Sequence, residues 1–157
     1  MTAMMIKQLP LKVRPSPKTE MRSQFAAVCY RIVGNNPVVL LITSRRSGRW
    51  IIPKGWPISG LTPAESAMQE AWEEAGVKGK TQDRCLGLFS YNKFLEPEQT
   101  LPCGAMVYPV QVKSMSPDFP EKGQRLRKWF APKKAARRVM EPELARILRD
   151  FDPRALR

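Results

Sequence analysis

An α/β fold, with a β-sheet packed between helices, is predicted by three features of this 157-residue sequence. Short segments rich in Val, Ile, Leu and aromatic residues indicate strands. Three segments of helical pattern each begin at a proline, which is favoured at the first position of a helix. Hydrophobic residues make up 43% of the chain, which is enough for one core. We therefore expect one domain over residues 22–151, preceded by an extended basic arm over residues 1–21 and followed by a short tail over residues 152–157.

The first half of the chain favours strands on both sides of a turn. Residues 23–33 and 37–43 are rich in β-branched and apolar side chains, and the Gly-Asn-Asn sequence between them suits a hairpin turn. Residues 50–52 indicate a further short apolar strand, which enters a loop rich in glycine and proline.

A helix is expected next, over residues 63–75. Thr62 suits the N-cap, Pro63 the first helical position, and Glu65 completes a capping box. Gly76 then provides the residue that ends the helix. Both ends are therefore specified locally.

The second half of the chain predicts a second hairpin, a short strand and two helices. The hairpin pairs residues 80–94 with residues 101–113, and its tip lies near residues 96–98. After a loop over residues 114–123 come a strand over residues 126–130 and helices over residues 132–139 and 142–151.

Three carboxylates crowd the C-terminal half of the first helix. Glu73 and Glu74 lie three and four residues after Glu70, so the three side chains share one flank. The negative end of the helix dipole adds to their repulsion. A hard divalent cation that also holds a polyphosphate is a suitable counter-charge. The competing interpretation is a solvated acidic face that pairs with Lys78 and Lys80.

The loop and the helix together resemble the signature sequence of the Nudix hydrolases. In that family the pattern runs glycine, five residues, Glu, seven residues, then Arg-Glu-aliphatic-x-Glu-Glu-x-Gly-aliphatic. The resemblance covers residues 22–151 and implies a helix–sheet–helix sandwich with a mixed β-sheet. This chain matches the signature at Gly55, Glu70, Ala71, Glu73, Glu74, Gly76 and Val77.

The resemblance also implies a role for each matched residue. Glu70, Glu74 and the Gly55 carbonyl would hold Mg²⁺ or Mn²⁺, and Glu73 would act as general base in hydrolysis of a phosphoanhydride bond. The residues themselves leave an exchange of roles among the three glutamates open, because nearby like charges and a cation shift a carboxyl pKa in opposite directions. The chain has no His, so acid–base chemistry and metal ligation fall to carboxylates.

Two positions depart from the signature. Leu61 stands where the family has Glu, and Gln69 stands where it has Arg. In the family these two residues form a salt bridge between loop and helix, and losing both avoids leaving one partly buried charge alone. We interpret the change as an altered brace beside intact metal-binding glutamates. The alternative is a weakened site that serves as a nucleotide sensor or an RNA-binding module.

Matches outside the signature resemble the branch that cleaves diphosphoinositol polyphosphates and diadenosine polyphosphates. This resemblance implies Arg45 and Arg127 as phosphate ligands, since a guanidinium binds phosphate oxygens in pairs. Lys54 is a further candidate, and each of the three could instead be a plain surface base. Trp56 either packs within its loop, which we favour, or stacks on an adenine or lines the mouth of the pocket. The matched segments are residues 43–45, 49–50, 76–79 and 127–130.

The net charge of +13 gathers at the two ends of the chain. Residues 1–22 carry five Lys and Arg against one acid, and residues 121–157 carry twelve against five. A nearly neutral middle between basic ends suits a polyanionic small-molecule substrate steered toward a metal centre. Nucleic acid is a secondary partner on the same grounds, which makes an RNA 5′-pyrophosphohydrolase the runner-up activity.

Cysteine use and hydropathy bear on the compartment. Cys29, Cys85 and Cys103 are widely spaced and odd in number, which suits reduced thiols better than disulfides or a zinc site. No apolar segment is long enough to span a membrane, and the N-terminus lacks the apolar core of a secretory signal. We therefore expect a cytoplasmic protein that does not enter a membrane.

Overall fold

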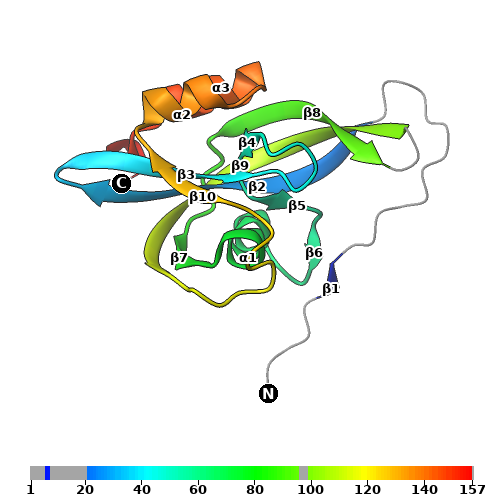
Figure 1. Cartoon of the computed structure of the whole chain (residues 1–157), viewed down its shortest axis with the longest axis horizontal. Coiled ribbons are helices and arrows are strands. Elements are labelled where there is room, and N and C mark those ends of the chain that lie inside the picture. The colour runs from blue at the N-terminus through cyan, green and yellow to red at the C-terminus, as the bar shows by residue number, and fades with distance from the viewer. Residues whose placement is uncertain (1–5, 8–20, 96–98, 157) are drawn as a thin grey trace.

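The computed structural model describes residues 6–7, 21–95 and 99–156, which form a β-sheet with helices on both faces (Figure 1). Helix α1 (Pro63–Ala75) covers one face, and helices α2 (Pro132–Arg138) and α3 (Pro142–Arg149) cover the other. A short 3-10 helix, η1 (Pro153–Leu156), follows. The predicted α/β sandwich is therefore confirmed. The strands are β1 (Ile6–Lys7), β2 (Arg22–Val33), β3 (Asn36–Thr43), β4 (Trp50–Ile51), β5 (Lys54–Gly55), β6 (Ile58–Ser59), β7 (Val77–Thr81), β8 (Gly87–Leu95), β9 (Gln99–Met115) and β10 (Arg127–Phe130).

One mixed sheet organises the domain. Its path runs β10–β3–β2–β9–β7, while β4, β5 and β8 pair with β3, β2 and β9 respectively. Strands β2 and β9 run parallel, from the pair Arg22↔Cys103 to the pair Tyr30↔Gln111. The remaining described pairs of this sheet are antiparallel. Outside it, β1 pairs with β6.

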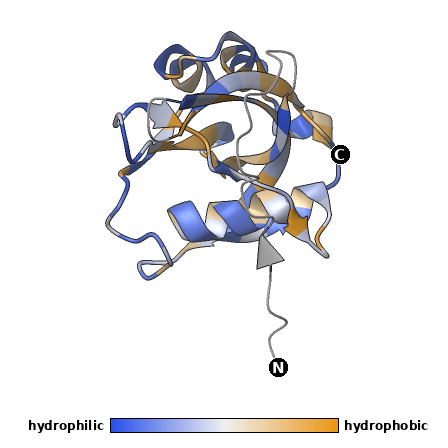
Figure 2. Cartoon of the chain, turned by 90° about the vertical axis from the view of Figure 1, so that its right-hand side faces the viewer, coloured by the Kyte–Doolittle hydropathy of each residue, from blue (hydrophilic) through white to orange (hydrophobic). Residues whose placement is uncertain are grey.

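Alternation along β2 divides the core into two layers. Val28 packs in the layer that contains Leu144 and Leu148 of α3. Its neighbour Ala27 points the other way, into the layer that contains Ala71 of α1. Figure 2 shows the same arrangement end-on, with the sheet between α1 and the α2–α3 pair. Helix α1 therefore packs against β2, β5, β7 and β9 of this sheet, and β5 belongs to the loop of the signature.

Helix α1, which carries the three glutamates, begins and ends as predicted. The Thr62 hydroxyl accepts a hydrogen bond from the Glu65 N–H at 3.2 Å, and the Glu65 carboxylate accepts one from the Thr62 N–H at 2.9 Å. Gly76 ends the helix at a φ of 69°, in the left-handed region. Because both ends are fixed, the direction in which the helix presents its carboxylates is fixed as well.

The prediction of one continuous strand over residues 80–94 is wrong, because this segment contains the end of β7 and most of β8 with a break between them. Strands β7 and β8 both pair with the same edge of the 17-residue β9, but residues 82–85 leave that edge, which the chain rejoins where the Leu86 N–H donates to the Val107 carbonyl oxygen at 2.7 Å. The polar Gln82, Asp83 and Arg84 have no apolar alternation to hold them in the sheet. The hairpin of β8 with β9 is confirmed, and its tip at residues 96–98 lies outside the described residues.

The two C-terminal helices begin at the predicted prolines and end slightly earlier than expected. Helix α2 stops at Arg138, because Val139 is extended, with φ −88° and ψ 155°. Helix α3 stops at Arg149, and Phe151 turns back into the core beside Tyr30, with ring centroids 5.1 Å apart. The tail thus begins with a packed aromatic ring.

The N-terminal arm, the cysteines and the hydropathy of the helices were also subjects of prediction. The arm over residues 1–21 lies almost wholly outside the described residues, so it stays a prediction. Cys29 and Cys103 are buried, Cys85 is exposed, and all three are free thiols. Within the described ranges, no helix has the length and apolar character needed to cross a membrane.

We predict that Gly76→Ala lowers the free energy of unfolding more than Gly48→Ala does. The two glycines have nearly the same φ, 69° and 68°, so both substitutions carry a left-handed penalty of roughly 1–2 kcal/mol. A Cβ at Gly76 would also lie 2.8 Å from the Ser116 carbonyl oxygen, whereas nothing lies within 4 Å of one at Gly48. Urea unfolding measures both losses. Equal losses would show that the chain around Gly76 gives way at no cost.

Candidate active site

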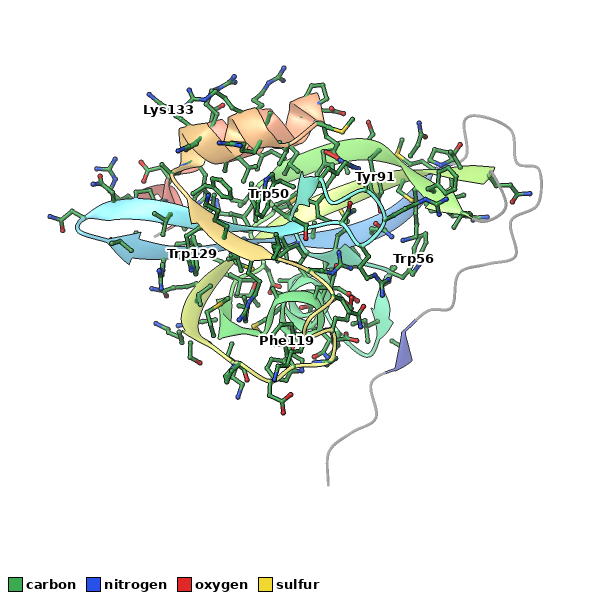
Figure 3. The ribbon with its side chains drawn as sticks, viewed as in Figure 1. Trp50, Trp56, Tyr91, Phe119, Trp129 and Lys133 are labelled. Carbon is green, nitrogen blue, oxygen red and sulfur yellow. The ribbon has the colours of Figure 1, made fainter. Side chains whose placement is uncertain are left out.

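A cleft of about 840 Å³ is lined by the loop before α1, by α1 itself, by β8 and by the segment that precedes β10. In Figure 3 it lies in the region of Trp56 and Tyr91. Five of the seven predicted site residues line it, namely Gly55, Glu70, Glu74, Arg45 and Lys54. Its basic lining residues are Arg45, Arg46, Arg49, Lys54, Lys93 and Arg125.

Helix α1 and strand β5 together form the acidic part of the cleft. Glu70 and Glu74, one turn apart on α1, are 3% and 5% exposed. Gly55 lies directly against Glu70, so that a Cβ at Gly55 would overlap its carboxylate. The Glu74 Oε2 accepts a hydrogen bond from the Lys54 backbone N–H at 3.1 Å. The signature glycine therefore allows a loop backbone to pack against both carboxylates.

Burial sets the electrostatics of Glu74. Loss of water raises the pKa of its carboxyl to about 7, while the charges of Arg125 and Lys54 lower it and that of Glu70 raises it. For Lys54, burial lowers the pKa of the ammonium to about 8, although Glu74 opposes this. Burial thus disfavours the charged form of this carboxyl even though Arg125 and Lys54 stand beside it. A further cation next to Glu74 would favour the charged form.

Arg125 lines the cleft and was not among the residues predicted from the sequence. Its guanidinium lies 3.1 Å from Glu74 Oε1 and 3.2 Å from Glu121 Oε1, and it donates to the Thr43 carbonyl oxygen at 3.1 Å. The side chain is only 8% exposed, so this is a buried ion pair with two acids. The spacing of Glu121 and Arg125, four residues apart, is the one sequence signal that pointed to it.

The structure does not bring Glu73 into the cleft. It is partly buried on the flank of α1, where its carboxylate accepts a hydrogen bond from Gln69 Nε2 at 3.4 Å. Its backbone carbonyl accepts from the Glu121 N–H at 3.0 Å. The assignment of Glu73 as general base stays a prediction.

Arg127 also lies away from the cleft lining. Its Nη1 donates to the Ala75 carbonyl oxygen at 2.8 Å and to that of Ser116 at 3.2 Å, and its guanidinium stacks over Phe119. A cation is favoured at this place, because the last carbonyls of α1 and the helix dipole are negative there. This geometry supports a capping role, and the predicted role as a phosphate ligand stays untested.

Arg45 stands at the mouth of the cleft. It is 60% exposed, donates to Gln124 Oε1 at 3.0 Å and lies 3.6 Å from Glu121. The neighbouring Arg46 lies over the Phe94 ring, 3.6 Å from its centroid. Both guanidinium groups are therefore accessible to an anion that enters from solvent.

The other cations of the cleft, Arg49, Lys54 and Lys93, contact either a carboxylate or an aromatic ring. Arg49 donates to Glu141 at 2.6 Å, which ties the cleft to the start of α3. Lys54 lies over Tyr91, whose hydroxyl bonds to the buried Gln24. Trp56 is partly buried in the cleft wall, with Lys93 Nζ 5.7 Å from its ring.

The two positions that depart from the signature, Leu61 and Gln69, are both uncharged and partly buried. Leu61 is partly buried, and its N–H donates to the Ile58 carbonyl oxygen at 3.1 Å. Gln69 is also partly buried and bonds to Glu73. Neither position leaves a charge without a partner, which fits the interpretation that both family charges were lost together.

The donor set fits Mg²⁺ or Mn²⁺. No group of three His, Cys, Asp or Glu side chains within the described residues is arranged to hold a metal ion. Glu70 and Glu74 do supply two buried carboxylates, and the backbone of Gly55 lies against the first of them. Mg²⁺ is usually held by one or two carboxylates, with water and substrate phosphates as its other ligands. The residues present therefore suit a metal that binds together with a phosphate substrate.

A family model described as the NUDIX domain matches residues 22–151. The chain belongs to the Nudix family. This confirms the resemblance found in the sequence, and it covers the segment that carries both the sheet and the cleft.

Relatives of this Nudix chain include phosphohydrolases. It is 33% identical to human diphosphoinositol polyphosphate phosphohydrolase 3-alpha over 111 residues, which cover 69% of this chain and 63% of that protein. It is 30% identical to Nudix hydrolase 12, mitochondrial, of Arabidopsis thaliana over 120 residues, covering 74% and 59%. The chain thus spans less than two thirds of either relative. A binary complex of the C. elegans Ap4A hydrolase shares the fold, with a TM-score of 0.62 at 18% identity, covering 87% of this chain and 98% of that one.

We predict that Arg125→Leu destabilises the Nudix domain far more than Arg154→Leu does. Without Arg125, the like charges of Glu74 and Glu121 lose the cation between them, and breaking such a buried pair costs about 3–5 kcal/mol. Arg154 pairs with Asp152 at the surface, where an ion pair contributes little. Urea unfolding in the presence of a chelator compares the two variants. Similar midpoints would mean that Arg125 does not hold the site together.

Proposed function

We propose that this protein hydrolyses a phosphoanhydride bond in diphosphoinositol polyphosphates or diadenosine polyphosphates, with the help of a divalent metal ion. The observation that carries the proposal is the buried carboxylate pair of Glu70 and Glu74, within a cleft that six basic residues line. Phosphoanhydride hydrolysis needs charge neutralisation on the phosphates and a positioned water. The acidic part of the cleft would neutralise the phosphates through a bound metal ion, and the basic part would neutralise them through its own cations.

We infer that Glu70, Glu74 and the Gly55 carbonyl hold the cation. When bound, Mg²⁺ or Mn²⁺ supplies charge neutralisation and lowers the pKa of a bound water. Gly55 permits this arrangement, because any side chain at that position would overlap the Glu70 carboxylate. The contact from the Lys54 N–H keeps one oxygen of Glu74 oriented.

The polyanionic substrate would be bound by cations that line the cleft. Arg45 and Lys54 are the proposed phosphate ligands, and Arg46 and Arg49 line the same cleft. Guanidinium groups bind phosphate oxygens bidentately, which suits substrates with several phosphates. The human and C. elegans proteins, named for diphosphoinositol polyphosphate and Ap4A substrates, support the two substrate classes.

The proposed general base is Glu73, on the strength of its place in the Nudix signature. Its carboxylate bonds to Gln69 on the flank of α1, so it would act through a change of side-chain rotamer or through water. Glu74 lies within the cleft and is the alternative base. Near-normal activity of Glu73→Gln together with an inactive Glu74→Gln would favour Glu74 as the base.

A substrate panel tests the proposed function. We expect turnover of a diphosphoinositol polyphosphate or of diadenosine tetraphosphate with Mg²⁺ or Mn²⁺, and none with a chelator. Preferred turnover of an RNA with a 5′-triphosphate would replace these substrates by RNA 5′ ends. Binding of the panel without turnover of any member would contradict the enzyme and favour a sensing module.

We predict that Glu74→Gln lowers kcat by about 100-fold or more, because it removes a charged metal ligand. Glu65→Gln is the matched control, since it makes the same change on the same helix while Gln still completes a capping box. Glu73→Gln should lower kcat by about 10²- to 10⁴-fold if Glu73 is the general base. Steady-state kinetics at saturating Mn²⁺, with circular dichroism of each variant, measures these effects. Near-normal activity of Glu74→Gln would refute the metal assignment.

A further inference from the structure

A second concentration of positive charge lies on the helical layer, away from the cleft. Lys133, Lys134, Arg137 and Arg138 are all exposed along α2, and Lys128 is exposed on β10. Figure 3 shows Lys133 at the outer side of this layer, away from the sheet. None of these five residues lines the cleft. We call this group of five the α2 basic surface.

The five cations form one continuous surface. Lys128 Nζ lies 5.4 Å from the centre of the Phe130 ring, and the Arg138 guanidinium lies 5.9 Å from the same point. One ring therefore joins the cation of β10 to those of α2. Within α2, Lys133 with Arg137 and Lys134 with Arg138 are neighbours at a spacing of four residues, about 6 Å along the axis.

The two lysines at the start of α2 are unfavourable for the helix itself, whereas Arg137 and Arg138 in its last turn suit the helix dipole. The first turn contains no acidic residue and no side chain caps it, while Lys133 and Lys134 stand at the positive end of the dipole. Like charges four residues apart cost roughly 0.2–0.5 kcal/mol per pair. A choice of residues that opposes local stability is expected where function requires it.

Nearby acids do not neutralise this surface. Glu141 is buried and bound to Arg49 at 2.6 Å, and Glu143 accepts from the Ser90 hydroxyl at 2.8 Å. On the next helix, by contrast, Arg149 pairs with Asp150 at 3.4 Å. No member of the α2 basic surface forms an ion pair with an acid of the described residues.

We propose that the α2 basic surface binds the phosphate backbone of a nucleic acid, without regard to base sequence. A row of uncompensated Lys and Arg along one helix, on a chain of net charge +13, is the electrostatic footprint of such binding. A lipid surface fits less well, because α2 turns its apolar residues inward. Ala135 is fully buried, and Ala136 and Val139 pack against the core, so α2 itself presents no apolar face to acyl chains, and the exposed Met140 beyond its end is a single residue. This binding does not depend on hydrolysis in the cleft.

The test uses the full chain and a fluorescent 12-nucleotide oligouridylate with a 5′-hydroxyl, in the presence of a chelator. This ligand has no phosphoanhydride, so the result is separate from the proposed activity. The variant K133Q/K134Q/R137Q/R138Q removes four charges, and Gln keeps the helix propensity. The matched control, K78Q/K80Q/K113Q/K122Q, removes four exposed lysines elsewhere. Anisotropy titrations between 50 and 200 mM salt give the affinity and its salt dependence.

We expect the α2 variant to bind at least about tenfold more weakly and to lower the slope of log K against log salt by about 2–3, since each single-strand phosphate contact contributes about 0.7. The control should keep most of the affinity and slope. The double variant K133Q/K134Q should lose about half of the effect. The α2 variant should also melt at a slightly higher temperature, because its helix is relieved of repulsion.

Three results would overturn the proposal. The first is a wild-type affinity and slope in the α2 variant. The second is an equal loss in both quadruple variants, which would mean that only total charge matters. The third is binding to vesicles of phosphatidylserine and phosphatidylcholine that needs the α2 basic surface, without binding to the oligonucleotide, which would assign the surface to membranes.

Discussion

The ion pair between Arg125 and Glu74 is the interaction on which the rest of the site depends. Glu74 belongs to α1, its second oxygen is bound by the N–H of Lys54 in the preceding loop, and Arg125 comes from the segment before β10. Three parts of the chain therefore meet at one buried carboxylate. Because Arg125 also holds Glu121, a single guanidinium keeps two like charges close together, and the cleft can contain acids without being forced apart.

The features that the sequence predicted correctly are mostly those that neighbouring residues determine. The bounds of α1 follow from Thr62, Glu65 and Gly76, all within or next to the helix, and the structure confirms them. The interruption of the β7–β8 edge was missed although the polar residues 82–84 mark it, because the pairing of both strands with β9 joins segments that are far apart along the chain. Arg125 was missed for the same reason, since its partner Glu74 is distant in sequence. Arg127 was chosen by resemblance, yet its guanidinium lies at the end of α1.

Cations in this domain occupy two different environments. In the cleft, Arg49 and Arg125 are each bound to a carboxylate, and Lys54 lies over an aromatic ring. Such positions fix the direction of a charge and suit recognition of a small, highly charged ligand. On α2 the cations are exposed and mutually repulsive, so they suit a long flexible polyanion that supplies many charges at once. The described cations thus include two groups in different electrostatic environments.

The parallel pairing of β2 with β9 has a consequence for how the domain folds. The chain that connects these two strands contains the β2–β3 hairpin, the loop of the signature and α1. Bringing the strands together closes a long loop, and the entropy of that closure must be offset before the central sheet exists. Domains dominated by such distant contacts fold slowly. Helix α1, with its own caps, is able to form early, but its glutamates meet Arg125 only after the sheet has closed. A newly made chain would therefore be without a working cleft until one of its last folding steps.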